Sequence, residues 1–249
     1  MDVEIKRDGL TLRGTLVKPK ADKFDMVVLM HGFTSNRGIE PDQLLYQLAQ
    51  RFEEKGLATL RFDFNGHGTS DGKFVDMTVL NEIGDGKAIL DYARNIKGVD
   101  HLYFLGHSQG GVVASMIAGY YHDKIDKLAL LAPAATLKDD ALKGSTQGYT
   151  YDPQNIPDTL PIKKGLTLGG FYLRTAQTLP IYDVAKEYHG PVCLIHGLKD
   201  TVVDHIASTR YDDVYTNDEL HLLADADHGF GINNSRQEAL DIATEFMLK

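Results

Sequence analysis

Residues 101–121 read HLYFLGHSQGGVVASMIAGYY, and this stretch decides the fold. The apolar run before Gly106 predicts a strand, and the small and apolar residues from 109 to 121 predict a helix directly after it. The turn between them has the pattern G-x-S-x-G, with Ser108 at its centre. Strand, tight turn and helix form the context in which this pattern presents a nucleophilic serine. A Cβ at Gly106 or Gly110 would crowd the packing of the helix against the strand, so glycine is expected at both positions.

A second match to the same pattern, GTSDG at residues 68–72, tests whether the pattern or its context carries the inference. It lies a few residues beyond the expected strand RFDF, and the next residues, KFVD, do not open a helix. Without that context Ser70 is not expected to be a nucleophile. The segment is interpreted as a glycine-rich loop whose backbone needs positive φ angles.

Strand-like and helix-like segments alternate along most of the chain. Strands are expected in an N-terminal hairpin around Arg7-Asp8-Gly9 and at residues 26–30, 58–62, 102–105, 127–131, 192–195 and 220–223. Helices are expected at residues 41–55, 77–94, 109–121, 204–214 and 236–248. This alternation predicts an α/β fold with a mostly parallel, eight-stranded sheet and helices on both faces. Right-handed crossovers then gather the functional loops at the carboxyl ends of the strands.

Residues 134–188 break this alternation, because they separate two strands by far more chain than one crossover helix needs. The segment contains many glycines and prolines, and a structureless loop of that length inside a compact domain is unusual. We interpret it as an inserted cap with short elements of its own, lying over the strand ends. The predicted organisation is a core of residues 1–133 and 189–249 with a cap at 134–188.

A nucleophilic serine needs a base, and the base needs an acid that orients it. His228 lies between the segment ELHLLA and the last helix, and Asp200 follows the strand VCLI. Both belong to the strand ends that should carry Ser108, and the chain order Ser, Asp, His is the expected one. Asp204 is the main rival for the acid. Two other acids lie beside the histidine in sequence and cannot easily reach round to its Nδ1: Asp225 and Asp227.

The oxyanion that forms when a serine attacks a carbonyl group needs two N–H donors. One should be the backbone N–H of Gln109, the residue after the nucleophile. The other should be the backbone N–H of Phe33, in the loop HGF that follows the strand at 26–30, with the ring of Phe33 facing the acyl pocket. The alternative is that HGF is merely a turn.

The remaining histidines have simpler interpretations. His31 and His196 each precede a glycine at a strand end, where an imidazole can satisfy loop backbone groups. His107 is next to the serine and could line the pocket. No two histidines have metal-ligand spacing with a supporting carboxylate, so neither a metal nor a cofactor is expected.

The composition of the 249 residues, 43% apolar and 24% charged, is that of an ordinary globular protein. Its 35 acidic and 26 basic side chains give a formal net charge of −9, which argues against nucleic acid or an anionic membrane surface as the main partner. The single cysteine, Cys193, excludes an intrachain disulfide. No apolar run approaches the length of a membrane span, and the first residues show no hydrophobic signal core, so we expect a cytoplasmic location.

Five segments together resemble the α/β-hydrolase superfamily, in its usual order: HGF (31–33), RFDFNGHGTSDG (61–72), GHSQGG (106–111), HGLKD (196–200) and ADHGF (226–230). Within that superfamily the chain looks like the bacterial cinnamoyl (feruloyl) esterases of lactobacilli and gut bacteria. The segments that carry this closer resemblance include MTVLNEI (77–83), LLAPAATLK (130–138), LTLGGFYLR (166–174) and PVCLIHG (191–197). Agreement inside the cap is more specific than a shared triad, because caps set substrate choice.

The resemblance implies a serine esterase that hydrolyses esters of ferulic, caffeic and p-coumaric acids, chlorogenate among them, without a cofactor. It also implies that Asp140 and Gln147 contact the ring hydroxyls of the substrate and that Tyr172 is the cap tyrosine of the pocket. Asp139 is an adjacent acid, so the register is open by one residue. Gly229 departs from relatives that carry a bulkier residue after the histidine. Such esterases are often homodimers, and a homodimer is a further expectation.

Three other functions remain open on the sequence. A broad short-acyl carboxylesterase or monoacylglycerol-type lipase would use the same triad, and only the cap would distinguish it. A serine aminopeptidase of this fold needs a negative subsite for the amine of its substrate, which an acidic cap allows. A non-catalytic binding protein of this fold should lack a member of the triad, whereas all three candidates are present.

Overall fold

Continuous apolar runs form the centre of the sheet, because helices cover both of its faces. The computed structural model describes residues 1–249. Its main sheet has eight strands: β1 (Asp2–Arg7), β2 (Leu10–Val17), β3 (Phe24–Met30), β4 (Ala58–Phe62), β5 (Val99–His107), β6 (Lys127–Leu131), β11 (Val192–Gly197) and β12 (Asp218–Leu223). Every residue of β4 and of β11 is buried, as expected for strands covered on both faces.

The strand order in the sheet is β1-β2-β4-β3-β5-β6-β11-β12. The N-terminal hairpin pairs antiparallel, and β2 also runs antiparallel to β4. All other neighbours, from β4 to β12, are parallel. The predicted α/β fold with a mostly parallel, eight-stranded sheet is therefore confirmed, and the carboxyl ends of six strands meet at one edge.

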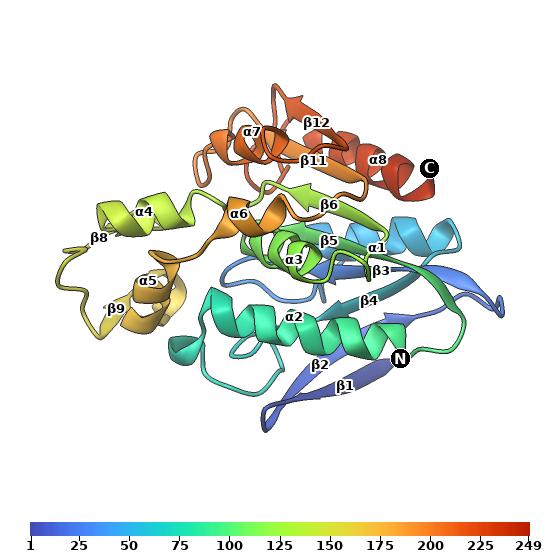
Figure 1. Ribbon diagram of the computed structural model, residues 1–249, viewed down its shortest axis with the longest axis horizontal. Helices are drawn as coiled ribbons and strands as arrows, with labels where there is room; N and C mark the ends of the chain where they lie inside the picture. Colours follow the sequence, from blue (N-terminus) through green and yellow to red (C-terminus); the bar gives the residue numbers. More distant parts are fainter.

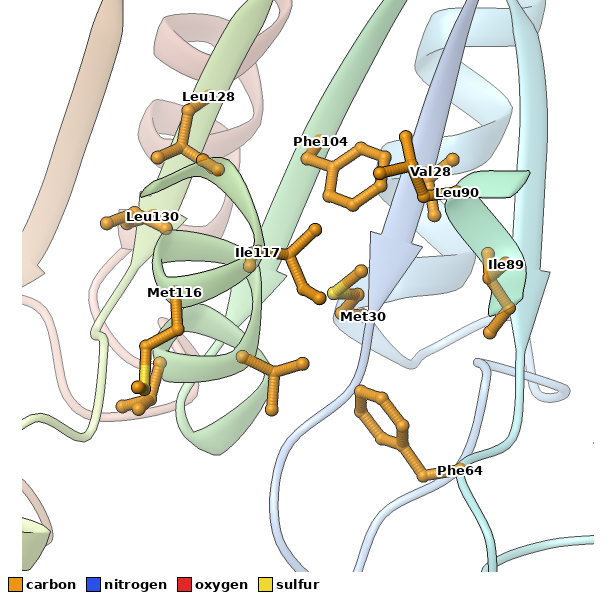
Figure 2. Close-up of a cluster of buried hydrophobic side chains, with 14 of the residues drawn as sticks. Val28, Met30, Phe64, Ile89, Leu90, Phe104, Met116, Ile117, Leu128 and Leu130 are labelled. Atoms are coloured by element: carbon orange, nitrogen blue, oxygen red, sulfur yellow. The ribbon is translucent and has the colours of Figure 1, made fainter. Parts of the chain in front are cut away.

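Two hydrophobic layers hold the helices on the sheet. On one face, α1 (Leu44–Glu54) and α8 (Ser235–Leu248) contact each other and cover a cluster that includes Leu105 and Ile195. On the other face lie α2 (Val79–Arg94), α3 (Gln109–Tyr120) and α6 (Ile181–Ala185). Figure 2 shows part of this second layer, with side chains of α2 and α3 lying against those of β3, β5 and β6.

Helix boundaries differ from the sequence expectations by a few residues. The helix expected from residue 77 begins at Val79, because Thr78 and Asn81 form a capping box in which each side chain accepts the other's backbone N–H. The helix expected at 204–214 is shorter, α7 (Ile206–Asp212), and follows an Asp204 side chain that accepts the N–H of Ile206.

The chain between β6 and β11 folds into short elements at the carboxyl ends of the strands. They are α4 (Leu137–Lys143), β7 (Ser145–Thr146), β8 (Tyr149–Thr150), β9 (Thr159–Pro161), β10 (Thr167–Gly169), α5 (Gly170–Ala176) and α6, with a 3-10 turn, η2, at Lys163–Gly165. Figure 1 shows α4, α5 and β9 gathered at the left end of the sheet. A second 3-10 turn, η1 (Phe74–Asp76), contacts β10 from the core. No helix of the chain combines the length and apolarity needed to cross a membrane.

Candidate active site

The turn between β5 and α3 holds Ser108 in a sparsely populated backbone conformation. Its φ of 56° and ψ of −123° form a combination that residues other than glycine rarely adopt. Glycines make this turn possible: a Cβ on Gly106 would overlap the carbonyl oxygen of Gly110, and a Cβ on Gly110 would overlap that of Met30. The local sequence therefore specifies a turn that presents the serine to a pocket lined partly by the segment between β6 and β11.

The structure brings Ser108, His228 and Asp200 together from three strand ends. Nε2 of His228 lies 2.9 Å from Oγ of Ser108, and its Nδ1 lies 2.7 Å from Oδ2 of Asp200. The serine is 5% exposed and the aspartate side chain is fully buried. The histidine side chain retains 18% exposure. This is the geometry in which a histidine can take a proton from a serine while a carboxylate holds its other nitrogen.

Asp200 accepts hydrogen bonds on both carboxyl oxygens. Oδ1 accepts the backbone N–H groups of Val202 and Val203 at 2.8 and 2.9 Å, and Oδ2 faces His228 and His196. Burial by itself raises the pKa of Asp200, but the hydrogen bonds from the two histidines and from Val203 outweigh it and hold that pKa well below its ordinary value. The carboxylate is therefore ionised throughout the neutral range.

The rival acids have other partners. Asp204 accepts the N–H of Ile206 at the start of α7. Asp225 pairs with Lys199, and Asp227 accepts the N–H of Gly231. None of them takes the place of Asp200 at Nδ1 of the histidine.

Two backbone N–H groups at the serine have no protein acceptor. They belong to Phe33 and Gln109. Gly32 lies directly against the serine, so closely that a Cβ there would stand 2.8 Å from Cβ of Ser108. This close approach places the HGF loop beside the nucleophile, where its N–H can serve as an oxyanion donor together with that of Gln109.

A pocket runs from the serine into the segment between β6 and β11. Its lining includes Phe33, Ser108 and Gln109 at the core end. The cap residues expected from the resemblance, Asp140 and Gln147, line the same pocket. Gln147 occupies the turn between β7 and β8 with a φ of 50°. The sequence reasoning thus placed these polar side chains in one cavity with the serine.

The two adjacent acids of α4 point in different directions. Asp140 lines the pocket, whereas Asp139 pairs with Arg210 of α7 and lines a separate hollow. Burial raises the pKa of Asp140, although a hydrogen bond from Thr136 acts in the opposite direction. Of the two registers left open by the sequence, the structure favours Asp140.

Tyr172 lines the pocket but its hydroxyl is already engaged. It donates to Oε1 of Gln109 at 2.7 Å, and its ring centroid lies 5.5 Å from that of Phe33. Nε2 of Gln109 in turn donates to Oε2 of Glu82 on α2 at 2.7 Å. Glu82 is fully buried, and this burial raises its pKa well above the ordinary value. A chain of hydrogen bonds therefore joins α5, the start of α3 and α2.

Sequence reasoning missed Glu82, and one signal could have revealed it. Val79, Glu82 and Ile89 lie on the buried face of α2. A carboxyl group at a core position of an amphipathic helix needs a partner, since an unpaired buried charge is costly.

The sequence left open that His107 lines the pocket, but the structure gives it another position. Its Nε2 lies 2.9 Å from the backbone oxygen of His228, and its ring centroid lies 5.1 Å from that of His228. Burial lowers the pKa of His107 to about 3, so the ring is neutral and can donate through Nε2. His107 thus supports the main chain of His228. His31 does satisfy loop backbone groups, because its Nδ1 contacts the oxygen of Gly32 and its Nε2 accepts the N–H of Phe64.

The second G-x-S-x-G match has a structural role. Oγ of Ser70 donates to the backbone oxygen of Asp63 at 2.6 Å and accepts the N–H of Arg13 at 2.8 Å. Gly68 has a φ of 49° and packs against the Asp63 carboxylate. Both observations agree with the interpretation of this segment as a loop.

Residues 21–151 match the sequence family described as serine aminopeptidase, S33. The structure is similar to that of Est1E from Butyrivibrio proteoclasticus with ferulic acid bound, with a TM-score of 0.94 and 35% identity over 99% of this chain and 98% of Est1E. A second structure of Est1E gives a TM-score of 0.89 and 31% identity, covering 99% of this chain and 97% of that one.

A relative from Mycoplasma genitalium, named provisionally as an esterase/lipase, is 29% identical over 116 residues. This match covers 47% of the present chain and 40% of the relative. The chain therefore matches less than half the length of this curated relative, whereas it matches nearly the whole of Est1E.

Proposed function

The chain belongs to the family described as serine aminopeptidase, S33, and is a serine esterase of the α/β-hydrolase fold, and we propose that it hydrolyses esters of hydroxycinnamic acids. The observation that carries this proposal is the pocket that joins Ser108 to Asp140 and Gln147. The proposal is also supported by the similarity, over nearly the full length, to the structure of Est1E with ferulic acid bound. The proposed acyl groups are ferulate, caffeate and p-coumarate. Chlorogenate is a proposed ester substrate.

In this proposal Ser108, His228 and Asp200 form the catalytic triad. His228 takes the proton of Ser108 through Nε2 as the serine oxygen attacks the ester carbonyl. Asp200 holds Nδ1 and stabilises the imidazolium that forms. The N–H groups of Phe33 and Gln109 donate to the oxyanion. The alcohol leaves with the proton from His228, and an acyl-enzyme remains.

Deacylation repeats these steps with water as the nucleophile. His228 takes a proton from the water as it attacks the acyl-enzyme, and the same N–H groups hold the second oxyanion. The proton then returns to Oγ of Ser108, and the phenolic acid is released. No other protein group needs to gain or lose a proton in the cycle.

The far end of the pocket supplies the proposed specificity. Residues 134–188 act as a cap that forms one wall of the acyl pocket over a core of residues 1–133 and 189–249. Asp140 and Gln147 offer an acceptor and an amide to the hydroxyl groups of the ring. Tyr172 contributes its ring to the wall, because its hydroxyl is bound to Gln109.

The test compares kcat/KM on methyl ferulate, methyl caffeate, p-nitrophenyl butyrate and an aminoacyl-p-nitroanilide, with Ser108→Ala as the control. A strong preference for the two hydroxycinnamates supports the proposal. Preference for the butyrate would leave a general short-acyl esterase. Preference for the anilide would indicate an aminopeptidase instead of an esterase.

Two further sequence expectations remain predictions. They are a homodimer and a cytoplasmic location. Light scattering coupled to size-exclusion chromatography tests the first, and fractionation of the source cells tests the second.

A further inference from the structure

A second histidine faces the carboxylate of the proposed triad. His196, near the end of β11, is fully buried. Its Nε2 lies 3.2 Å from Oδ2 of Asp200 and 3.1 Å from the backbone oxygen of Val203. Both of these oxygens can only accept, because one belongs to an ionised carboxylate and the other to a carbonyl. Nε2 of His196 must therefore carry a hydrogen, which it shares between them.

A hydrogen bond at the other ring nitrogen, Nδ1, stabilises this tautomer of His196. Nδ1 of His196 lies 2.7 Å from Oγ of Ser208 on α7, and Ser208 is also fully buried. The serine hydroxyl is the only hydrogen-bond partner of Nδ1, and it can donate. A neutral imidazole with its hydrogen on Nε2 satisfies every polar group in this cluster.

All hydrogen bonds to Asp200 can now be assigned. Oδ1 accepts two backbone N–H groups, so the loop fixes one carboxyl oxygen. Oδ2 faces two histidines, His228 at 2.7 Å and His196 at 3.2 Å. The oxygen that orients His228 is thus held from its other side by His196, whose own position is fixed by Ser208.

We propose that His196 is a positioning residue for the triad, which holds Oδ2 of Asp200 against Nδ1 of His228 through its Nε2–H. This inference rests on the proposed triad. It goes beyond satisfying the backbone of a loop, because only one of the two acceptors of Nε2 is a backbone group.

The hydrogen bond from His196 to Oδ2 of Asp200 also has an electrostatic consequence. A donor on Oδ2 withdraws negative charge from the atom that stabilises the imidazolium of His228. Removing that donor should make His228 more basic. His107, at the end of β5, also faces His228 and Asp200, and Arg236, at the start of α8, acts on His107 and donates to the backbone oxygen of Gly229. The variants below leave both residues unchanged.

The experiment uses three variants of the full chain and one matched control. His196→Phe keeps an aromatic ring and removes both nitrogens. His196→Gln restores an N–H donor at about the reach of Nε2. Ser208→Ala keeps the histidine and removes the group that fixes its tautomer. Ser115→Ala is the control, because Ser115 is equally buried and its hydroxyl contacts Tyr211 at 2.7 Å, away from the triad.

The readouts are kcat per active site and the pH profile of kcat/KM, with active sites counted by stoichiometric labelling of Ser108 with a fluorophosphonate. For His196→Phe we expect kcat to fall roughly 10- to 100-fold, since small errors in geometry have large effects on rate. We expect the acidic limb of kcat/KM, which reports the histidine base of the free enzyme, to move up by about half to one pH unit. His196→Gln should recover most of both effects, and Ser208→Ala should show a smaller shift in the same direction.

A residue that only supports the fold would reduce the number of active sites and leave the limb in place. An unmoved limb in both His196→Phe and Ser208→Ala therefore overturns the proposal, even where kcat falls. A limb that moves equally in Ser115→Ala overturns it too. If His196→Phe does not fold, the other two variants carry the test. Near-normal turnover of Ser108→Ala would instead refute the proposed triad, which keeps the two failures distinct.

Discussion

Replacing Asp140 by asparagine should separate recognition of the phenol from the chemistry at the serine. Asp140 lines the pocket from α4, while Ser108 lies at its core end. The substitution preserves the size of the side chain and removes its charge. We expect kcat/KM to fall on methyl p-coumarate, which carries a ring hydroxyl, and to stay within about twofold on methyl cinnamate, which carries none.

The size of the loss follows from the environment of the carboxyl group. A hydrogen bond to a charged group contributes about 1.5–3 kcal/mol when it is well shielded from water. Asp140 is only half-buried, so the contribution should lie near the lower end. About 1–2 kcal/mol corresponds to a loss of about 5- to 30-fold in kcat/KM on the hydroxylated ester.

The adjacent acid provides a matched control. Asp139→Asn makes the same chemical change one residue away, but Asp139 faces Arg210 and not the pocket. Steady-state hydrolysis of both esters, followed by absorbance, gives the two ratios. Equal losses on p-coumarate and cinnamate in Asp140→Asn, or the same selective loss in Asp139→Asn, would refute the assignment.

Three other predictions follow from the site. Ser108→Ala should lower kcat by about four to six orders of magnitude with Tm unchanged; near-normal turnover would exclude the serine as nucleophile. Tyr172→Phe leaves Oε1 of Gln109 without its donor, which should reduce the free energy of unfolding by about 1–3 kcal/mol; urea denaturation measures this, and an unchanged value would mean that the hydroxyl is dispensable. Burial lowers the pKa of His107 to about 3, so below its unfolded pKa the unfolded chain binds more protons and stability falls as pH drops from about 6.5 towards 3. His107→Gln should therefore show a shallower loss of Tm over that window in calorimetry, and a parallel loss would contradict the argument.

The features that the sequence predicted well depend on short stretches of chain. The strand, the turn at Ser108 and the helix lie within residues 101–121, and the glycines that the turn needs are part of the same pattern. His228 and Asp200 are far from the serine in sequence. Parallel strands nevertheless end at one edge of a sheet, so their positions after strands were enough to group them.

The features that it missed depend on which way a side chain points after the chain has folded. Whether Asp139 or Asp140 faces the pocket depends on the orientation of α4, which is set by its contacts with β7 and α5. Likewise the bond from Tyr172 to Gln109 spans 63 residues, and no local pattern encodes such a contact. The elements between β6 and β11 could be anticipated as short but not located, because each contains too few residues to show a period.

The hydrogen bonds from Tyr172 through Gln109 to Glu82 have a consequence for the exchange of caps between related enzymes. In the proposed mechanism Gln109 contributes its N–H to the oxyanion, while its side chain accepts a hydrogen bond from the hydroxyl of Tyr172 and donates to Glu82. Suppose that residues 134–188 alone were replaced by the proposed cap of a relative that has no tyrosine at position 172. Gln109, which donates to the buried Glu82, would then lack the hydroxyl donor that it has in this chain. The transferable unit of specificity is therefore discontinuous in sequence, and it includes positions 82 and 109 of the core.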